Sequence, residues 1–240
     1  MIYNFNDAQV HFELIKGRSE KVLIYLHGWG RSGKDFKKFV DVFEEYSILL
    51  IDFPPFGKSK FNPQNFSIFS YANIVIGLCE HLNISTADFI GHSFGGRVCL
   101  IISALKPSLV HKCIYVDSAG MKPRRGIKYY AKVWKYKLCR KLGKTTHGGS
   151  DDYRALSPEM KGLFNNIVNT HLEEFAKEVV SPSLIVWGEK DDQTPLYMGK
   201  RLNRLIDDSK FEVIKNAGHF SLLDSPLEFA SIVLKFLKEN

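Results

Sequence analysis

The segment Gly91 to Gly95 (GHSFG) fits the pattern Gly-x-Ser-x-Gly, which places a nucleophilic serine on a sharp turn. A short apolar stretch at 87–90 predicts a strand before it, and residues 96–103 predict a helix after it. On such a turn the Oγ of Ser93 is exposed at the end of a sheet, and the N-terminus of the helix directs its N–H groups toward a developing oxyanion. The spacing predicts serine-based acyl transfer, although a glycine-rich turn with an incidental serine would also fit the pentapeptide alone.

A nucleophilic serine needs a base, and the base needs an acid that orients it; with this turn the chain order is Ser, Asp or Glu, then His. His219 is the predicted base, because it follows Gly218 in a loop just after the last predicted strand, at the edge of the sheet where Ser93 lies. The three other histidines that follow the serine fall at predicted helix ends or in the insertion described below, and we expect them to face solvent: His111, His147 and His171.

The acid is expected in the loop that follows the preceding strand, between Trp187 and Pro195. Asp191 is the predicted acid. Asp192 is its nearest competitor, with capping of the next helix as its alternative role. Asp117, at the end of an earlier strand, is a third candidate, with hydrogen bonding at the start of the insertion as its alternative role.

The elements that must position these residues alternate between strands and helices along the chain. Strands are predicted at 21–26, 46–52, 87–90, 112–117, 182–187 and 211–214. Helices are predicted at 35–45, 70–82, 96–103, 157–165, 170–178 and after Ser225. Together they predict an α/β fold with a mostly parallel, doubly wound sheet. Two alternating segments, 2–6 and 9–16, predict an antiparallel pair at one edge.

One stretch, 119–181, contains no clear strand, and a structureless loop of this length would be improbable. Apolar residues recur within it at helical spacing; they are Ile127, Tyr130, Ala131, Trp134 and Leu138. We therefore predict a small helical cap at 119–181, inserted into a core formed by 1–118 and 182–240.

Positive charge is concentrated in the first half of this cap. The chain has 240 residues and a net charge of +7, and ten Lys and Arg residues but no Asp or Glu fall between Ser118 and Ser150. The rest of the chain is therefore mildly acidic. The basic block predicts either a solvated helix face or a surface that attracts an anionic substrate or partner.

Composition excludes several other classes of protein. The 45% hydrophobic content suits a globular domain, and no apolar run reaches the roughly 18–20 residues of a membrane span. The N-terminus does not have the pattern of a signal peptide, and the four cysteines have no C-x-x-C spacing, which predicts a reduced, cytoplasmic setting. We see no glycine-rich phosphate loop and no metal-ligand cluster, so we expect no cofactor, no metal and no nucleic-acid partner.

Taken in order, five segments resemble the motifs of the α/β-hydrolase superfamily, in particular its capped carboxylesterases, proline iminopeptidases and C–C hydrolases. These segments are 27–30, 52–59, 91–96, 188–195 and 218–219. The resemblance covers nearly the whole chain outside the cap. It implies an oxyanion hole formed by the backbone N–H groups of Trp29 and Phe94, with His27 shaping that loop and His92 packing beside the nucleophile.

The same resemblance guides the choice among reactions. Dehalogenases and epoxide hydrolases of this superfamily carry aspartate where this chain has Ser93, and its C–C hydrolases usually carry Asn at the position of His92 and Trp at that of Phe220. We therefore expect a serine hydrolase that cleaves a small carboxylic ester. If the basic block attracts the substrate, that ester is anionic. C–C or amide hydrolysis on the same triad, and a slow-turnover ligand receptor, remain alternatives. Tyr130, Trp134 and Phe220 are expected in the substrate pocket, but the sequence predicts neither the natural substrate nor the oligomeric state.

Overall fold

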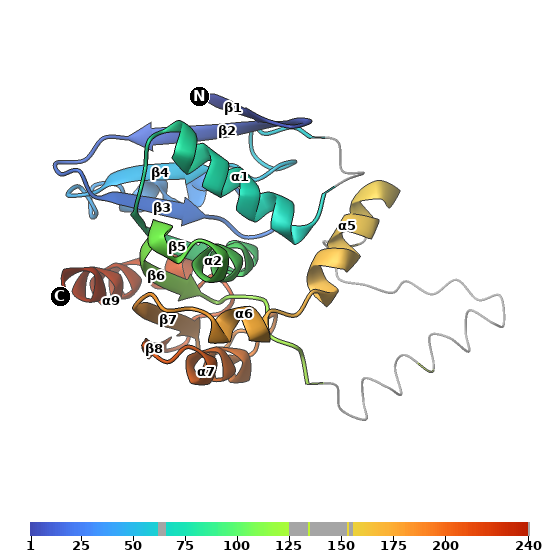
Figure 1. Ribbon diagram of the computed structural model, residues 1–240. Helices are drawn as coiled ribbons and strands as arrows, with labels where there is room; N and C mark the ends of the chain where they lie inside the picture. The colour runs from blue at the N-terminus through green and yellow to red at the C-terminus, as the bar shows by residue number, and fades with distance from the viewer. Residues whose placement is uncertain (62–65, 125–133, 135–152, 154–155, 240) are drawn as a thin grey trace.

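The computed structural model describes residues 1–61, 66–124, 134, 153 and 156–239. Eight of its strands form one sheet in the order β1-β2-β4-β3-β5-β6-β7-β8 (Figure 1). The strands are β1 (Ile2–Phe5), β2 (Ala8–Ile15), β3 (Val22–Leu26), β4 (Ser47–Ile51), β5 (Ala87–His92), β6 (Val110–Val116), β7 (Ser183–Gly188) and β8 (Ser209–Ile214). This is the mostly parallel, doubly wound sheet that the sequence predicts.

The direction of the strands decides where a site can form. β1 and β2 pair antiparallel at one edge, and β2 also runs antiparallel to β4. From β4 onward the neighbours β3, β5, β6, β7 and β8 are all parallel. The loops that leave the carboxyl ends of these strands therefore meet at one edge of the sheet, which is where ligands bind in open α/β sheets.

Helices cover both faces of the sheet, because the parallel strands bury both sides. Within β3, Leu23 and Tyr25 belong to one buried apolar cluster, and Ile24 and Leu26 belong to the other. The face with Ile24 packs against α1 (Ile68–His81), α2 (Phe94–Leu105), α6 (Glu173–Lys177) and α7 (Leu196–Leu205). The opposite face packs against η1 (Gly33–Phe39), α8 (Ser221–Asp224) and α9 (Pro226–Lys238).

Within the described ranges, the helix predicted at 35–45 is the element whose type differs. The chain forms a 3₁₀ helix at Gly33–Phe39 and continues in turns. Phe36 and Phe39 are three residues apart, a spacing that aligns their side chains on one face of a 3₁₀ helix. Both rings and that of Phe43 are buried against the sheet. Packing of the three rings, with the Phe36 and Phe43 rings 5.6 Å apart, therefore decides the local geometry.

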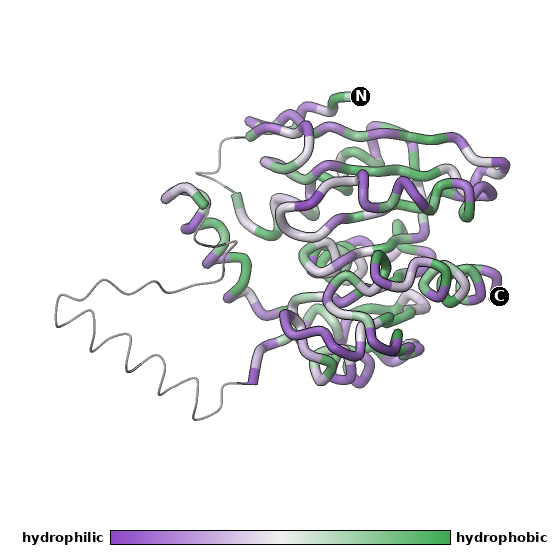
Figure 2. Tube along the Cα trace, turned by 180° about the vertical axis from the view of Figure 1, so that it is seen from behind, coloured by the Kyte–Doolittle hydropathy of each residue, from purple (hydrophilic) through white to green (hydrophobic). Residues whose placement is uncertain are grey.

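Two helices occupy the described part of 119–181, as the sequence predicts: α5 (Pro158–Asn169) and α6. Figure 1 shows α5 standing away from the sheet and its covering helices. The helix is amphipathic, with hydrophilic and hydrophobic segments alternating along it in Figure 2; its buried side chains are Met160, Leu163 and Ile167. The boundaries of the predicted cap remain a prediction.

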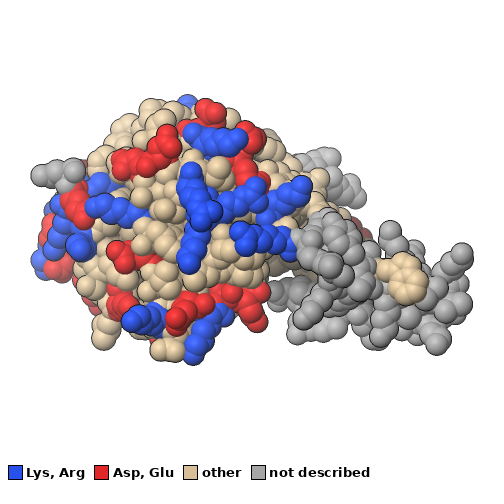
Figure 3. Space-filling model, turned by 90° about the horizontal axis from the view of Figure 1, so that it is seen from below, with Lys and Arg blue, Asp and Glu red and all other residues tan. Residues whose placement is uncertain are grey.

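Most of the basic block lies outside the described residues, which contain Lys122 and Arg124 of its ten Lys and Arg residues. Lys and Arg side chains also gather across the middle of the face seen in Figure 3, with Asp and Glu around them. None of the helices in the described ranges has both the length and the apolarity to span a bilayer.

Candidate active site

Ser93 lies at the junction of β5 and α2, in the tight turn that its motif predicts. Its φ of 50° is in the left-handed region, which a residue with a side chain rarely adopts. The surrounding backbone holds this conformation: the Ser93 N–H donates to the carbonyl of Val116 at 3.0 Å, and its own carbonyl accepts from the N–H of Gly96 at 3.1 Å. The strained turn directs the side chain away from the helix and into a cavity, which Ser93 lines.

Gly95 permits the close approach of this turn to β3. A Cβ on Gly95 would collide with the carbonyl oxygen of Leu26, and a Cβ on Gly91 would lie 2.6 Å from the Sγ of Cys99. A side chain at either position would therefore push the start of α2 away from the sheet, and the oxygen of Ser93 would move with it.

We expect Gly95→Ala to lower the melting temperature by about 3–10 °C, because overpacking costs about 1–3 kcal/mol. Activity should fall more than stability, since the displaced turn carries Ser93. Gly162→Ala is the matched control: Gly162 is exposed on α5 with open space around its Cα, and alanine there should leave the protein as stable or more so. Thermal melts followed by circular dichroism measure both variants. A Gly95→Ala protein with unchanged melting and activity would contradict this account of the turn.

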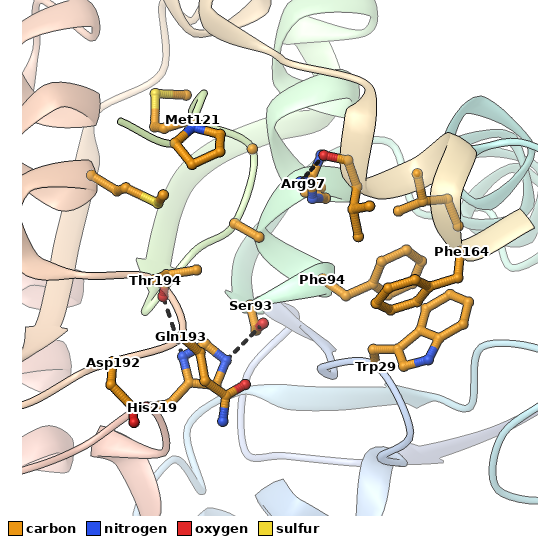
Figure 4. Close-up of a pocket in the computed structure, with 16 residues that line it drawn as sticks. Trp29, Ser93, Phe94, Arg97, Met121, Phe164, Asp192, Gln193, Thr194 and His219 are labelled. Carbon is orange, nitrogen blue, oxygen red and sulfur yellow. Dashed lines mark hydrogen bonds between the residues drawn. The ribbon is translucent and has the colours of Figure 1, made fainter. Parts of the chain in front are cut away.

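The structure brings the three predicted catalytic residues into one hydrogen-bonded row. His219 Nε2 lies 2.9 Å from Ser93 Oγ, and His219 Nδ1 lies 2.9 Å from Asp191 Oδ2. Figure 4 shows the ring of His219 with one nitrogen turned to Ser93 and the other to Thr194. Because Asp191 can only accept, Nδ1–H donates to it and Nε2 is left to accept the hydroxyl proton of Ser93.

Asp191 is the acid that reaches His219, and the two competing carboxylates lie elsewhere. Asp192 is exposed and lines the cavity. Asp117 is buried beneath the two loops: Oδ1 accepts from the N–H of Gly188 at 2.7 Å, and Oδ2 accepts from the N–H of Ser221 at 3.1 Å. It therefore ties the acid loop to the base loop, rather than bonding at the start of the insertion as its alternative role predicted. Burial raises the pKa of Asp117 to about 7, against the opposing effect of the hydrogen bonds from the Ser221 hydroxyl and the Gly188 N–H.

The Asp191 carboxylate is held by several donors besides His219. Oδ1 accepts from the backbone N–H groups of Gln193 and Thr194, each at 2.9 Å, and Oδ2 accepts from Thr194 Oγ1 at 2.6 Å. Burial alone would raise the pKa of Asp191, but the hydrogen bonds from His219 and Thr194 outweigh it and leave the pKa below its usual range. The acid is therefore ionised and fixed in orientation.

Thr194 is a site residue that the sequence analysis missed. Its Oγ1 lies 2.6 Å from Asp191 Oδ2, 3.2 Å from His219 Nδ1 and 3.0 Å from the carbonyl of Asp117. A hydroxyl three residues after the acid was the available signal, because short side chains in a loop commonly bond to their neighbours.

Thr194→Val should lower kcat for ester hydrolysis by about 10–100-fold, because a hydrogen bond to a charged group contributes about 1.5–3 kcal/mol. Valine keeps the shape of threonine and removes the hydroxyl, so burial is unchanged. The Asp191 carboxyl also loses a donor that lowers its pKa, so the loss should grow as the pH falls. Thr194→Ser restores the hydroxyl and should recover most of the activity. Steady-state rates measured across pH test this prediction. If Thr194→Val were as active as Thr194→Ser, the hydroxyl would have no role in the reaction.

The predicted oxyanion donors belong to the same cavity wall. Phe94 is the first residue of α2, so its N–H has no acceptor within the helix, and both Phe94 and Trp29 line the cavity beside Ser93. The two rings pack edge to face, with centroids 5.4 Å apart. His27 shapes this loop as predicted: its Nδ1–H donates to the Gly28 carbonyl and its Nε2 accepts from a backbone N–H, each at 2.7 Å. Burial lowers the pKa of His27 to about 4, so the ring is neutral.

His92 packs beside the nucleophile turn, as expected, and has a further contact with the base. Its Nε2–H donates to the backbone carbonyl of His219 at 2.8 Å. Burial lowers the pKa of His92 to about 3, so the ring stays neutral. The residue before the nucleophile therefore holds the backbone of the base in place.

The predicted pocket residues need correction. Phe220 does not line the cavity; its ring centroid lies 5.2 Å from that of His92 and 5.2 Å from Cζ of Arg31. Trp134 is 67% exposed and does not line it either. Tyr130 lies outside the described residues.

A cavity of about 860 Å³ opens above Ser93, within the range of small-molecule sites. Its wall combines hydrophobic side chains from the core and from α5 with a few polar groups (Figure 4). The hydrophobic lining includes Trp29, Phe94, Met121, Phe164, Ile167 and Met198. Across the described ranges, no group of three or more His, Cys, Asp or Glu side chains is placed to hold a metal ion.

Comparisons with known proteins show the family and the fold of this chain. A family model described as alpha/beta hydrolase fold matches residues 21–138 and 118–226. The uncharacterized hydrolase YugF of Bacillus subtilis is 28% identical over 98% of this chain and 97% of its own length. A 2-hydroxy-6-oxononadienedioate/2-hydroxy-6-oxononatrienedioate hydrolase of a Pseudomonas species is 25% identical over 92% of this chain and 89% of its own. Among solved structures, MGS-M2, an alpha/beta hydrolase enzyme from a deep-sea metagenome, superposes with a TM-score of 0.81 at 20% identity, covering 100% of this chain and 98% of that one.

Proposed function

Because the chain belongs to the alpha/beta hydrolase fold family, we propose that it is a serine hydrolase that cleaves a small carboxylic ester. Ser93 is the nucleophile, His219 the base and Asp191 the orienting acid. The observation that carries the proposal is the unbroken row of hydrogen bonds from Ser93 Oγ through His219 to Asp191, with 2.9 Å at each step. The row ends in a cavity large enough for a small ester.

The geometry supports a two-stage reaction. As Ser93 Oγ bonds to the ester carbonyl carbon, its proton passes to His219 Nε2, and the carbonyl oxygen becomes an oxyanion. The N–H groups of Trp29 and Phe94 stabilise that charge. The carbon–oxygen bond to the leaving alcohol then breaks, and His219 gives its proton to the departing oxygen. Water then attacks the acyl carbon as His219 takes its proton. The bond from that carbon to Ser93 Oγ breaks, His219 returns the proton to Oγ, and the carboxylic acid is released.

Hydrolysis of a C–C bond on the same triad is the second candidate, and the Pseudomonas relative supports it through the dienedioate substrate in its name. Two features of this chain favour the ester. His92 is buried, donates its Nε2–H to the carbonyl of His219 and is not among the residues that line the cavity. Phe220 likewise lies away from the cavity wall.

The test measures hydrolysis of a panel of p-nitrophenyl esters and compares it with hydrolysis of lactones, amides and a vinylogous diketone acid. Only a C–C hydrolase would cleave the diketone acid. The proposal expects multiple turnovers on esters. A single burst of p-nitrophenol with no further release would favour a slow-turnover receptor instead. Cleavage of the diketone acid, together with inert esters, would favour the second candidate.

A further inference from the structure

Arg97 is a buried cation in the wall of the cavity that contains Ser93. It lies on α2, four residues after the serine, and its side chain is 6% exposed. It lines the same cavity as Ser93 and His219, and the mechanism above makes no use of it.

The guanidinium of Arg97 bonds to neutral groups. Its Nη1–H donates to the carbonyl of Thr170 at 2.6 Å, and its Nη2–H donates to that of Val168 at 3.4 Å, both at the end of α5. Two of the five N–H donors of the guanidinium are used in this way. Glu173 is the acid that acts on it electrostatically, but that carboxylate is already paired with Arg201 at 3.2 Å. In the part of the chain that the structure describes, no carboxylate forms an ion pair with Arg97.

A buried charge without a counter-ion is costly. Burial lowers the pKa of Arg97 to about 10, and the group therefore stays protonated at neutral pH. The carbonyls of Val168 and Thr170 lie at the negative end of α5, which favours a nearby cation, but among the described residues they engage two of the five N–H donors and supply no full negative charge. A cation in the wall of a cavity beside a nucleophile is also suited to bind an anion that enters with the ligand.

The distribution of charge around the cavity favours binding of this anion on the side of Arg97. Figure 4 shows Arg97 and Asp192 on opposite sides of Ser93, with apolar side chains such as Phe164 on the side of Arg97. An anionic group near Asp192 would be repelled, whereas one near Arg97 would be paired. Residues four apart on an α-helix differ by roughly 6 Å along its axis. A short hydrocarbon chain would therefore separate the anion from the reacting carbonyl.

The geometry points to a carboxylate subsite at Arg97: the substrate is an ester whose acyl chain ends in a second, free carboxylate, bound by the guanidinium while Ser93 attacks the ester carbonyl. This inference rests on the proposed ester hydrolysis and adds the class of acyl group. A planar carboxylate matches the fork of the guanidinium, and the apolar side chains that line the cavity match a hydrocarbon chain between the two groups.

The test compares two substrates of the same shape: the p-nitrophenyl monoester of adipic acid, and the p-nitrophenyl ester of the branched acid in which an isopropyl group replaces the free carboxylate. Wild-type protein should favour the anionic ester in kcat/KM. Arg97→Gln should reduce that preference by a factor on the order of a hundred, mostly through KM, because a buried charge pair is lost. Arg97→Lys keeps the positive charge but lacks the planar guanidinium. Its preference for the anionic ester should therefore lie between those of wild type and Arg97→Gln.

Two controls separate the possible causes. Lys177→Gln removes an exposed positive charge that pairs with Glu174 and does not line the cavity, and it should leave the preference unchanged. In wild type alone, adipic acid monoamide should inhibit hydrolysis of the neutral ester better than the uncharged diamide, which tests the subsite even if Arg97→Gln does not fold. An equal preference in wild type and Arg97→Gln, or equal inhibition by the two amides, would overturn the inference. If the neutral ester is hydrolysed in either of these cases, the proposed function stands and only the subsite falls.

Discussion

Replacing Ser93 with alanine should lower kcat for ester hydrolysis by a factor on the order of 10⁴–10⁶, because the reaction then has no atom to carry the acyl group. His219→Ala should cost a similar factor, and the double variant should be little worse than either single one. When residues act together in one step, the first substitution already removes their joint contribution to kcat, so a second one costs little more. Steady-state assays on a p-nitrophenyl ester measure these losses, with single-turnover rates where activity is low.

Ser183→Ala is the matched control for the serine. Ser183 is equally a short hydroxyl residue and is buried, but it lies on β7, where its Oγ–H donates to the carbonyl of Ser181. A fluorophosphonate should label wild type and Ser183→Ala, and fail to label Ser93→Ala. Labelling that survives in Ser93→Ala would assign the nucleophile to another residue.

Asp191→Asn should lower kcat by about 10⁴, even though the two side chains have nearly the same shape. An amide nitrogen facing Nδ1 of His219 would favour the wrong ring tautomer, and the imidazolium that forms during attack would lose its negative neighbour. The loss should appear in kcat, while the overall fold survives.

Asp192→Asn is the control, because it makes the same chemical change one residue along. Asp192 is exposed and accepts no bond from His219 in the described structure, so its loss should stay within about tenfold. A large loss in Asp192→Asn beside a tolerated Asp191→Asn would transfer the role of acid to Asp192.

The three residues of the hydrogen-bonded row could be predicted from the sequence because each lies in the turn or loop that follows the carboxyl end of a parallel strand. Strand periodicity predicts the sheet, and a parallel sheet brings its carboxyl-end loops together whatever the rest of the chain does. Ser93, Asp191 and His219 therefore converge in space although 126 residues separate the first from the last.

The residues that were missed or misplaced depend on side-chain direction, which no local pattern records. Thr194 and Arg97 look like ordinary loop and helix residues until tertiary packing turns one toward Asp191 and the other toward α5. Phe220 follows the base in sequence, yet its ring packs on His92, outside the cavity. The 3₁₀ helix at Gly33–Phe39 likewise reflects the packing of its phenylalanines against the sheet more than intrinsic helix propensity.

The attachment of 119–181 to the rest of the molecule has a consequence for how such a protein changes over generations. Arg97 grips it through the carbonyls of Val168 and Thr170, and the N–H of Ala119 donates to the carbonyl of Ser93. In these three contacts the 119–181 side offers main-chain atoms, which every amino acid supplies. Substitutions at these positions in 119–181 can therefore accumulate without releasing the grip. Selection for substrates with a different acyl group can therefore change the part of the cavity wall that 119–181 supplies, while the hydrogen-bonded row from Ser93 to Asp191 stays the same.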